Sequence, residues 1–198
     1  MTTAMRGERG ILVTRAPLAV AASWARRGVV PCRLREDQGW SVITPAGRAE
    51  APEPYRDEMR LLAARPVGQR MRPAAGFFLF DETAVVTSHG PGWRPVTRWL
   101  LRRADGTVKG DKNLAPLRPS DLTPLASVGP AGRMTAALTE HFYREDLTSR
   151  AWLTALLDHL RIPGAGAFGP NPPQGGSLVQ PTGRAVRAFA TTVADERS

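Results

Sequence analysis

The sequence predicts a mixed α+β protein: a ferredoxin-like βαββαβ-type sandwich with extra strands, followed by a C-terminal helical hairpin and a flexible tail. Strand-like and helix-like segments alternate in this order through the first half of the chain. Two leucine-bearing helical stripes follow, and Gly and Pro then make up 11 of the 21 residues from 163 to 183. These observations divide the chain into a basic α+β domain at 1–128, a helical hairpin packed on it at 129–163, and a linker with a short terminal helix at 164–198.

The first strand and helix follow from short-range signals. Ile11-Leu12-Val13 is apolar and β-branched, which favours a strand. The segment 17–28 begins with Pro, is rich in Ala, carries two arginines in its last turn and ends at Gly28. Each of these features is typical of a helix in that position.

A hairpin is predicted next, because Val30, Cys32 and Leu34 alternate with polar or charged neighbours. The segment 40–44 is predicted to pair with this strand after the turn at 36–39. Alternation places Cys32 on the apolar face as a buried thiol, and Arg33 and Arg35 on the opposite, wetter face.

The segment 55–62 has apolar residues at helical spacing, and Pro66 ends it. The central hairpin is predicted to follow, with arms at 77–80 and 84–87. Its first arm, Phe-Phe-Leu-Phe, does not alternate, so we expect a strand buried on both faces.

The segment 96–103 is predicted to extend the sheet, with 107–109 returning as its partner. A helix is the alternative, because Leu and Arg are not specific to strands. Residues 112–124 hold three prolines and are predicted to be a loop. Helical stripes then lie within 134–142 and 153–160, and a shorter one within 184–194.

The net charge of +9 is confined to one part of the chain: residues 1–118 carry all of it, and 119–198 are neutral. A basic body of this kind attracts anionic partners through its field. The competing interpretation is genome composition, since 25 of the 27 basic residues are arginine.

Cys32 is the only cysteine, so we expect no internal disulfide, and a cytoplasmic location fits. No segment has the length of a membrane span, and arginines interrupt the one signal-like stretch near the N-terminus. We expect no membrane association, no cofactor and no metal ion. None of the three histidines lies at helical spacing from another.

His89 is the one weak catalytic candidate, because it ends a buried strand and precedes Gly90-Pro91-Gly92. As a base it would need Cys32 or Ser88 as the nucleophile and a nearby carboxylate such as Asp81. Ser88 is a poor partner, because neighbouring residues of a strand point to opposite faces.

Interleaved arginines and tryptophans are the stronger signal, since one accessible face of such residues would bind anions or stack bases. The alternative is that Trp40 and Trp99 belong to the core and the arginines form a solvated rim. The candidate binding residues are Arg33, Arg35, Trp93, Arg94, Arg98, Arg102 and Arg103.

The sequence therefore favours a non-enzymatic binding or accessory protein that recognises a protein or other anionic partner through a basic Arg/Trp-bearing face. Single-stranded nucleic-acid binding and a small enzyme with a cleft at the His89 loop stay open as alternatives. A protein partner is preferred over nucleic acid, and the sequence does not specify an oligomeric state.

Overall fold

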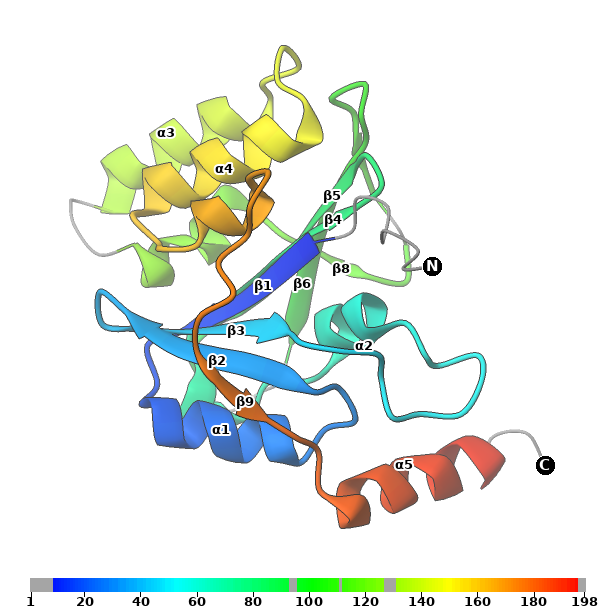
Figure 1. The fold of residues 1–198 in the computed structure, drawn as a ribbon. Helices are drawn as coiled ribbons and strands as arrows, with labels where there is room; N and C mark the ends of the chain where they lie inside the picture. Colours follow the sequence, from blue (N-terminus) through cyan, green and yellow to red (C-terminus); the bar gives the residue numbers. More distant parts are fainter. Residues whose placement is uncertain (1–8, 93–95, 111, 127–130, 196–198) are drawn as a thin grey trace.

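The computed structural model describes residues 9–92, 96–110, 112–126 and 131–195. These residues form a mixed α+β structure around one nine-stranded sheet (Figure 1). The strands are β1 (Arg9–Thr14), β2 (Cys32–Asp37), β3 (Trp40–Pro45), β4 (Ala74–Phe80), β5 (Thr83–His89), β6 (Thr97–Arg102), β7 (Val108–Lys109), β8 (Ala115–Pro116) and β9 (Ser177–Val179). The helices are α1 (Leu18–Arg26), α2 (Glu58–Ala64), α3 (Ala131–Phe142), α4 (Ser149–Leu160) and α5 (Gly183–Asp195).

The sheet has the order β7-β6-β5-β4-β1-β3-β2-β9, and β8 pairs with β6 beside β7. All neighbours along this path are antiparallel, whereas β8 is parallel to β6. The chain therefore forms a wider sheet than the sandwich predicted from its first six elements.

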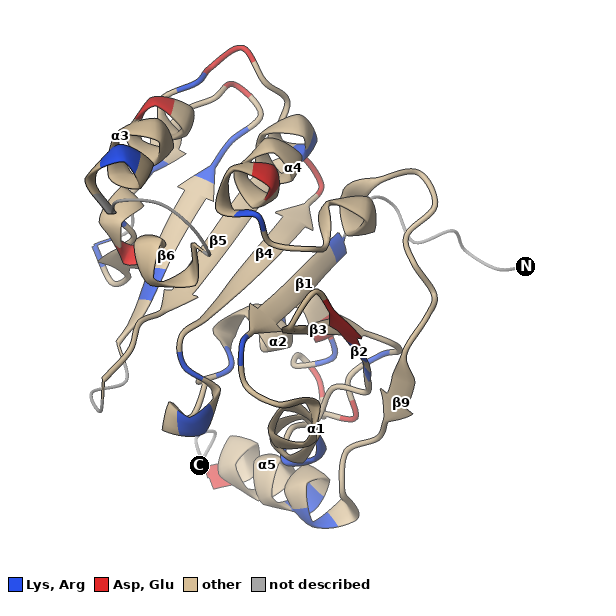
Figure 2. Ribbon diagram, turned by 90° about the vertical axis from the view of Figure 1, so that its left-hand side faces the viewer, with Lys and Arg blue, Asp and Glu red and all other residues tan. Residues whose placement is uncertain are grey.

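Helices cover both faces of the sheet, so the architecture has three layers (Figures 1 and 2). On one face, α1 and α2 pack over a core that includes Leu12, Ile43 and Phe78. On the other, α3 and α4 pack over Ile11, Phe77 and their neighbours. The core on the second face accounts for the expected burial of the central strand on both sides.

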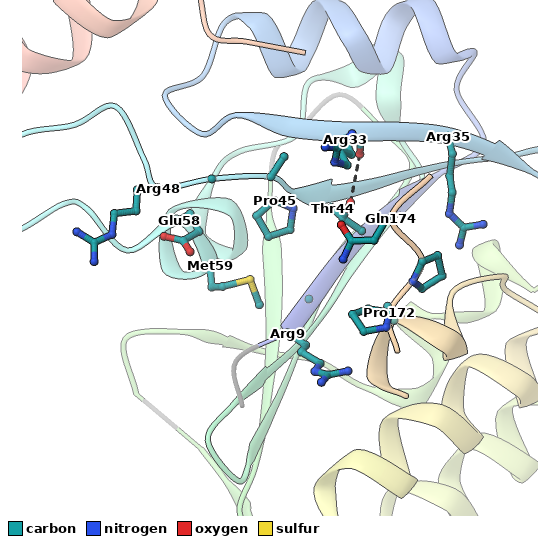
Figure 3. Close-up of a pocket in the computed structure, with 15 residues that line it drawn as sticks. Arg9, Arg33, Arg35, Thr44, Pro45, Arg48, Glu58, Met59, Pro172 and Gln174 are labelled. Atoms are coloured by element: carbon teal, nitrogen blue, oxygen red, sulfur yellow. Dashed lines mark hydrogen bonds between the residues drawn. The ribbon is translucent and has the colours of Figure 1, made fainter. Parts of the chain in front are cut away.

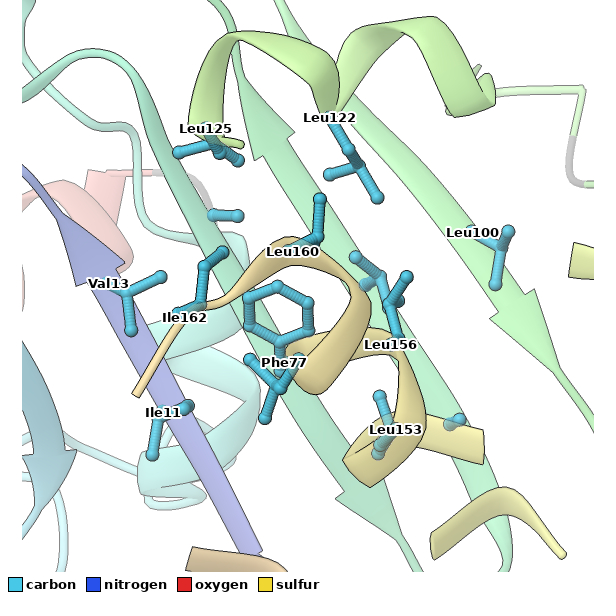
Figure 4. Packing of buried hydrophobic residues seen from close by; sticks show 14 of the residues in the cluster. Ile11, Val13, Phe77, Leu100, Leu122, Leu125, Leu153, Leu156, Leu160 and Ile162 are labelled. Carbon is cyan, nitrogen blue, oxygen red and sulfur yellow. The ribbon is translucent and has the colours of Figure 1, made fainter. Parts of the chain in front are cut away.

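The central hairpin of β4 and β5 is confirmed as a pair of strands buried on both faces. Phe77 and Leu79 point into the core under α4, whereas Phe78 points into the core under α1 and α2. In Figure 4, leucines of α4 surround Phe77. The missing alternation in this segment thus reflects two cores, one on each side.

Segment 96–103 is a strand rather than the alternative helix, because β6 pairs with β5 over six residues and with β7. The loop predicted at 112–124 also contains β8 and two 3-10 turns. Leu117, Leu122 and Leu125 from this stretch are buried in the core under α3 and α4.

The helices α3 and α4 are both confirmed, and they join at a mutual contact. The indole Nε1 of Trp152 donates to the carbonyl of His141 over 2.9 Å, and His141 Nε2 lies 3.0 Å from the carbonyl of Trp152. Thr148 caps α4, accepting from the backbone N–H of Ala151 over 3.3 Å.

The flexible linker predicted in the first part of 164–198 is the prediction that differs most from the structure. A 3-10 turn at Ala165–Phe168 places Phe168 in the core, and β9 pairs with the outer edge of β2. The Arg9 guanidinium also donates to the carbonyl of Gly169. The Gly and Pro content prevents independent folding, but the existing sheet edge and core supply the missing hydrogen bonds and burial.

The terminal helix is confirmed as α5, and it packs on the rest of the chain. The rings of Phe189 and Tyr55 meet edge to face at 5.8 Å between centroids, and Val193 is buried. Among the described residues, no helix is both long and apolar enough to cross a bilayer.

Candidate anion-binding pocket

A pocket of about 370 Å³ lies beside β2 and β3, where the chain segment 167–174 crosses the sheet (Figure 3). Its walls come from β1, β2, the end of β3, the connector after β3, the start of α2 and this crossing segment. We call it the arginine pocket. The lining residues used below are Arg9, Arg33, Arg35, Arg48, Glu58 and Gln174.

Strand alternation explains why two arginines of β2 reach this pocket. Cys32 and Leu34 point into the core under α1 and α2, so Arg33 and Arg35 point to the opposite face. No residue of β2 belongs to the core under α3 and α4. This face of β2 therefore lies beyond that core, and a charged side chain there escapes full burial.

The four arginines of the pocket differ in whether their guanidinium groups already have partners within the protein. Arg35 pairs with Asp37, and Arg9 donates to the carbonyl of Gly169. Arg33 is half-buried, and neither Arg33 nor Arg48 makes a side-chain hydrogen bond or ion pair with another described residue. At least two guanidinium groups therefore keep their donors for solvent or for a ligand.

The other walls of the pocket are largely apolar. Met59, Pro45 and Ala167 line it together with Pro172 and Pro173 from the crossing segment. Apolar walls keep water away from part of the pocket, and they strengthen any charge pairing inside it.

Four of the predicted binding residues lie on two strands, β2 and β6, that are separated by four other strands of the sheet. Arg33 and Arg35 are on β2, Arg98 and Arg102 on β6, with β5, β4, β1 and β3 in between. In Figure 2, Lys and Arg are spread over both ends of the sheet, α1 and α5 and are mixed with Asp and Glu. The single basic Arg/Trp face is therefore not formed by the described residues, and Trp93 and Arg94 lie outside them.

Arg102, another of the predicted binding residues, has a completely buried side chain. Its Nη2 donates to the carbonyls of Arg144 over 2.9 Å and Leu147 over 2.7 Å. Both carbonyls belong to the connection between α3 and α4. Arg102 thus ties this connection to the sheet.

The other two arginines of this group are more accessible. Arg98 pairs with Asp121 over 3.3 Å, and Arg103 is exposed at the turn after β6. Trp99 is half-buried beside the core under α1 and α2, and Trp40 is 1% exposed. Trp40 therefore belongs to the core, as the alternative expects, whereas Trp99 packs against the core and stays partly exposed.

His89 is buried at the end of β5, and burial lowers its pKa to about 4, with the nearby Arg72 adding to the shift. Its Nδ1 lies 3.3 Å from the hydroxyl of Thr97, and its Nε2 has no partner among the described residues. Ser88 points to the opposite face and donates to the carbonyl of Asp121. No described carboxylate or thiol is within hydrogen-bond reach of His89, so the groups that a general base needs are not assembled there.

Cys32 is also remote from His89, since β3, β1 and β4 lie between their strands. Its thiol is buried near the carbonyl of Val30, and burial raises its pKa to about 12 despite the nearby Arg65. In the part of the chain that the structure describes, no three His, Cys, Asp or Glu side chains converge as metal ligands would.

Three charged residues of the pocket were not predicted from the sequence: Arg9, Arg48 and Glu58. Arg9 had a detectable signal, because it lies two residues before Ile11 and shares its face. Arg48 and Glu58 had none, since the connector and α2 reach the pocket only through the tertiary fold. Comparison of the chain with protein-family models, with curated proteins and with solved structures finds no match.

Proposed function

We propose that this chain is a non-enzymatic binding protein that recognises an anionic partner, and that the anion binds in the arginine pocket. One observation carries the proposal: arginines from β1, β2 and the connector after β3 line the same pocket, although they are far apart in the sequence. That the partner is a protein stays a prediction.

The chemistry of the pocket supports an anion with several oxygen atoms. A guanidinium presents five donors in a planar fork, which matches a carboxylate or phosphate group. Arg33 is half-buried and has no described partner for these donors. A bound anion would supply the missing acceptors without displacing an existing ion pair.

The two alternative functions have less support. A stacking surface for single-stranded nucleic acid requires Arg102 and the arginines of β2 on one accessible face, but Arg102 is buried and the two strands are far apart in the sheet. An enzyme at the His89 loop requires a partner that activates His89, and the described residues offer none.

Calorimetric titration with inorganic phosphate, pyrophosphate and citrate tests anion binding. We expect at least one of them to bind with a Kd below about 1 mM, and Arg33→Ala to weaken that binding by about tenfold or more. Arg103→Ala is the matched control, because it removes the same charge from an exposed site at the other end of the sheet. We expect it to change the Kd less than about twofold at moderate salt.

Two results would overturn the proposal. One is that none of the three anions binds the wild-type chain. The other is that Arg33→Ala and Arg103→Ala weaken binding equally, because the anion would then respond to net charge and not to the pocket.

We also infer a ferredoxin-like unit within residues 9–80. Support comes from the order β4-β1-β3-β2, from antiparallel pairing throughout, and from α1 and α2 packing on the same face. The other five strands would then extend this unit on both sides. An experimental structure with another order among these four strands would contradict the inference.

A further inference from the structure

Glu58 is a charged residue of the arginine pocket that the anion proposal does not explain. It is the first residue of α2 and is 9% exposed. Its carboxylate forms no hydrogen bond or ion pair with another described residue, in contrast to Asp57, which caps α2 by accepting from the backbone N–H of Arg60 over 2.9 Å. The helix is therefore already capped without Glu58.

Glu58 is nine-tenths buried as a whole residue, but its carboxylate oxygens are not among the buried polar atoms that lack a hydrogen-bond partner, and the residue lines the pocket. The carboxylate is therefore open to a ligand in the pocket and has no competing partner in the described structure. Four arginines line the same pocket, yet none of them forms an ion pair with Glu58 in the described structure.

Acidic and basic side chains both line the pocket. In Figure 3, Glu58 and Arg48 lie at one end, and Arg33 and Arg35 lie toward the other. The side chain of Met59 and the ring of Pro45 lie between the two ends. The pocket thus has a carboxylate and one arginine at one end and two more arginines toward the other, with an apolar wall between the ends.

We infer that the arginine pocket takes a small amphoteric ligand, whose carboxylate or phosphate binds at Arg33 and whose ammonium or amino group binds at Glu58. The inference rests on the proposed anion binding and names the ligand class for the same site. A ligand with both charges pairs Glu58 and Arg33 at once, whereas a simple anion leaves the Glu58 carboxylate unpaired. A volume of about 370 Å³ lies at the small end of ligand pockets, which fits a molecule of this kind.

Two matched pairs of probes separate the carboxylate from the phosphate form of the ligand. The first pair is 6-aminohexanoate and hexanoate, and the second is O-phosphoethanolamine and ethyl phosphate. Within each pair the members share the anionic group and differ mainly in the amine. Protein-observed NMR titration detects binding even where the Kd is on the order of millimolar.

We expect the wild-type chain to bind the amino-bearing member of at least one pair about fivefold or more tightly than its partner, because the amine gains a charge-assisted hydrogen bond to the Glu58 carboxylate. Glu58→Gln should reduce this preference to about twofold or less, and it should leave the affinity for the plain anion equal or higher. Glu36→Gln is the matched control: it removes an exposed carboxylate from β2 outside the pocket, and it should retain the full preference.

The outcomes distinguish this inference from the anion proposal. If both members of each pair bind equally well and Arg33→Ala weakens both, the anion proposal stands and the amphoteric ligand is refuted. If the preference persists in Glu58→Gln, the amine does not bind at Glu58 and the inference is also refuted. If no probe binds and phosphate, pyrophosphate and citrate do not bind either, the anion proposal fails and this inference fails with it.

An unchanged thermal midpoint of Glu58→Gln shows that the variant is folded. If it is not folded, Glu58→Asp replaces it, because the shorter side chain withdraws the carboxylate and should also lower the preference.

Discussion

Replacement of Arg102 by Met should strongly destabilise the fold, because it removes the donors of a completely buried guanidinium. Nη2 bonds to two backbone carbonyls at 2.9 and 2.7 Å, and each bond to a charged donor contributes about 1.5–3 kcal/mol. Met has a similar apolar stem but no donor, so both carbonyls would be left buried and unsatisfied. We therefore expect the free energy of unfolding to fall by about 3–5 kcal/mol.

Urea denaturation at neutral pH measures this loss. For an m-value of about 2 kcal/mol/M, the midpoint should fall by about 2 M. Arg103→Met is the matched control, because its side chain is exposed next to Arg102, and its effect should stay within about 0.5 kcal/mol. Equal midpoints for Arg102→Met and the wild type would refute the structural role of Arg102 and return it to the candidate binding residues.

Two further predictions concern the buried titratable groups. Burial lowers the pKa values of His89 and His141 to about 4, so below their unfolded pKa of 6.5 the unfolded chain binds protons that the native chain excludes. The free energy of unfolding should therefore fall by about 3 kcal/mol per histidine between about pH 6.5 and pH 4. Urea midpoints across this range should depend less on pH in a variant that combines His89→Asn and His141→Gln. A wild-type midpoint that is constant across this range would contradict the lowered pKa values of the two histidines. Because burial raises the pKa of Cys32 to about 12, its thiol should not react with a disulfide reagent at pH 8 until the chain is unfolded, and rapid stoichiometric labelling of the native protein would show that it is accessible.

Arginines on two strands in different parts of the sheet gave the same sequence signal, but one is engaged within the fold and the other is not. Arg33 and Arg102 both lie on strands with apolar neighbours, and both were candidates for binding. The loop between α3 and α4 covers Arg102 and offers it carbonyl acceptors, whereas the segments around Arg33 leave a pocket beside it. Whether a strand arginine is free or engaged depends on what packs over it, and that information is not local in sequence.

The sequence by itself determined the local elements, because their causes are local: the alternation of Cys32 and Leu34 with arginines, the unbroken apolar run of β4, and the helical stripes of α3 and α4. It also placed Arg33 and Arg35 on a common face through strand periodicity. Only the tertiary structure decided the docking of the segment 164–182 on the edge of β2 and the meeting of Glu58 with arginines from distant segments. These features depend on contacts between residues that are far apart along the chain, where no periodicity or turn preference connects them.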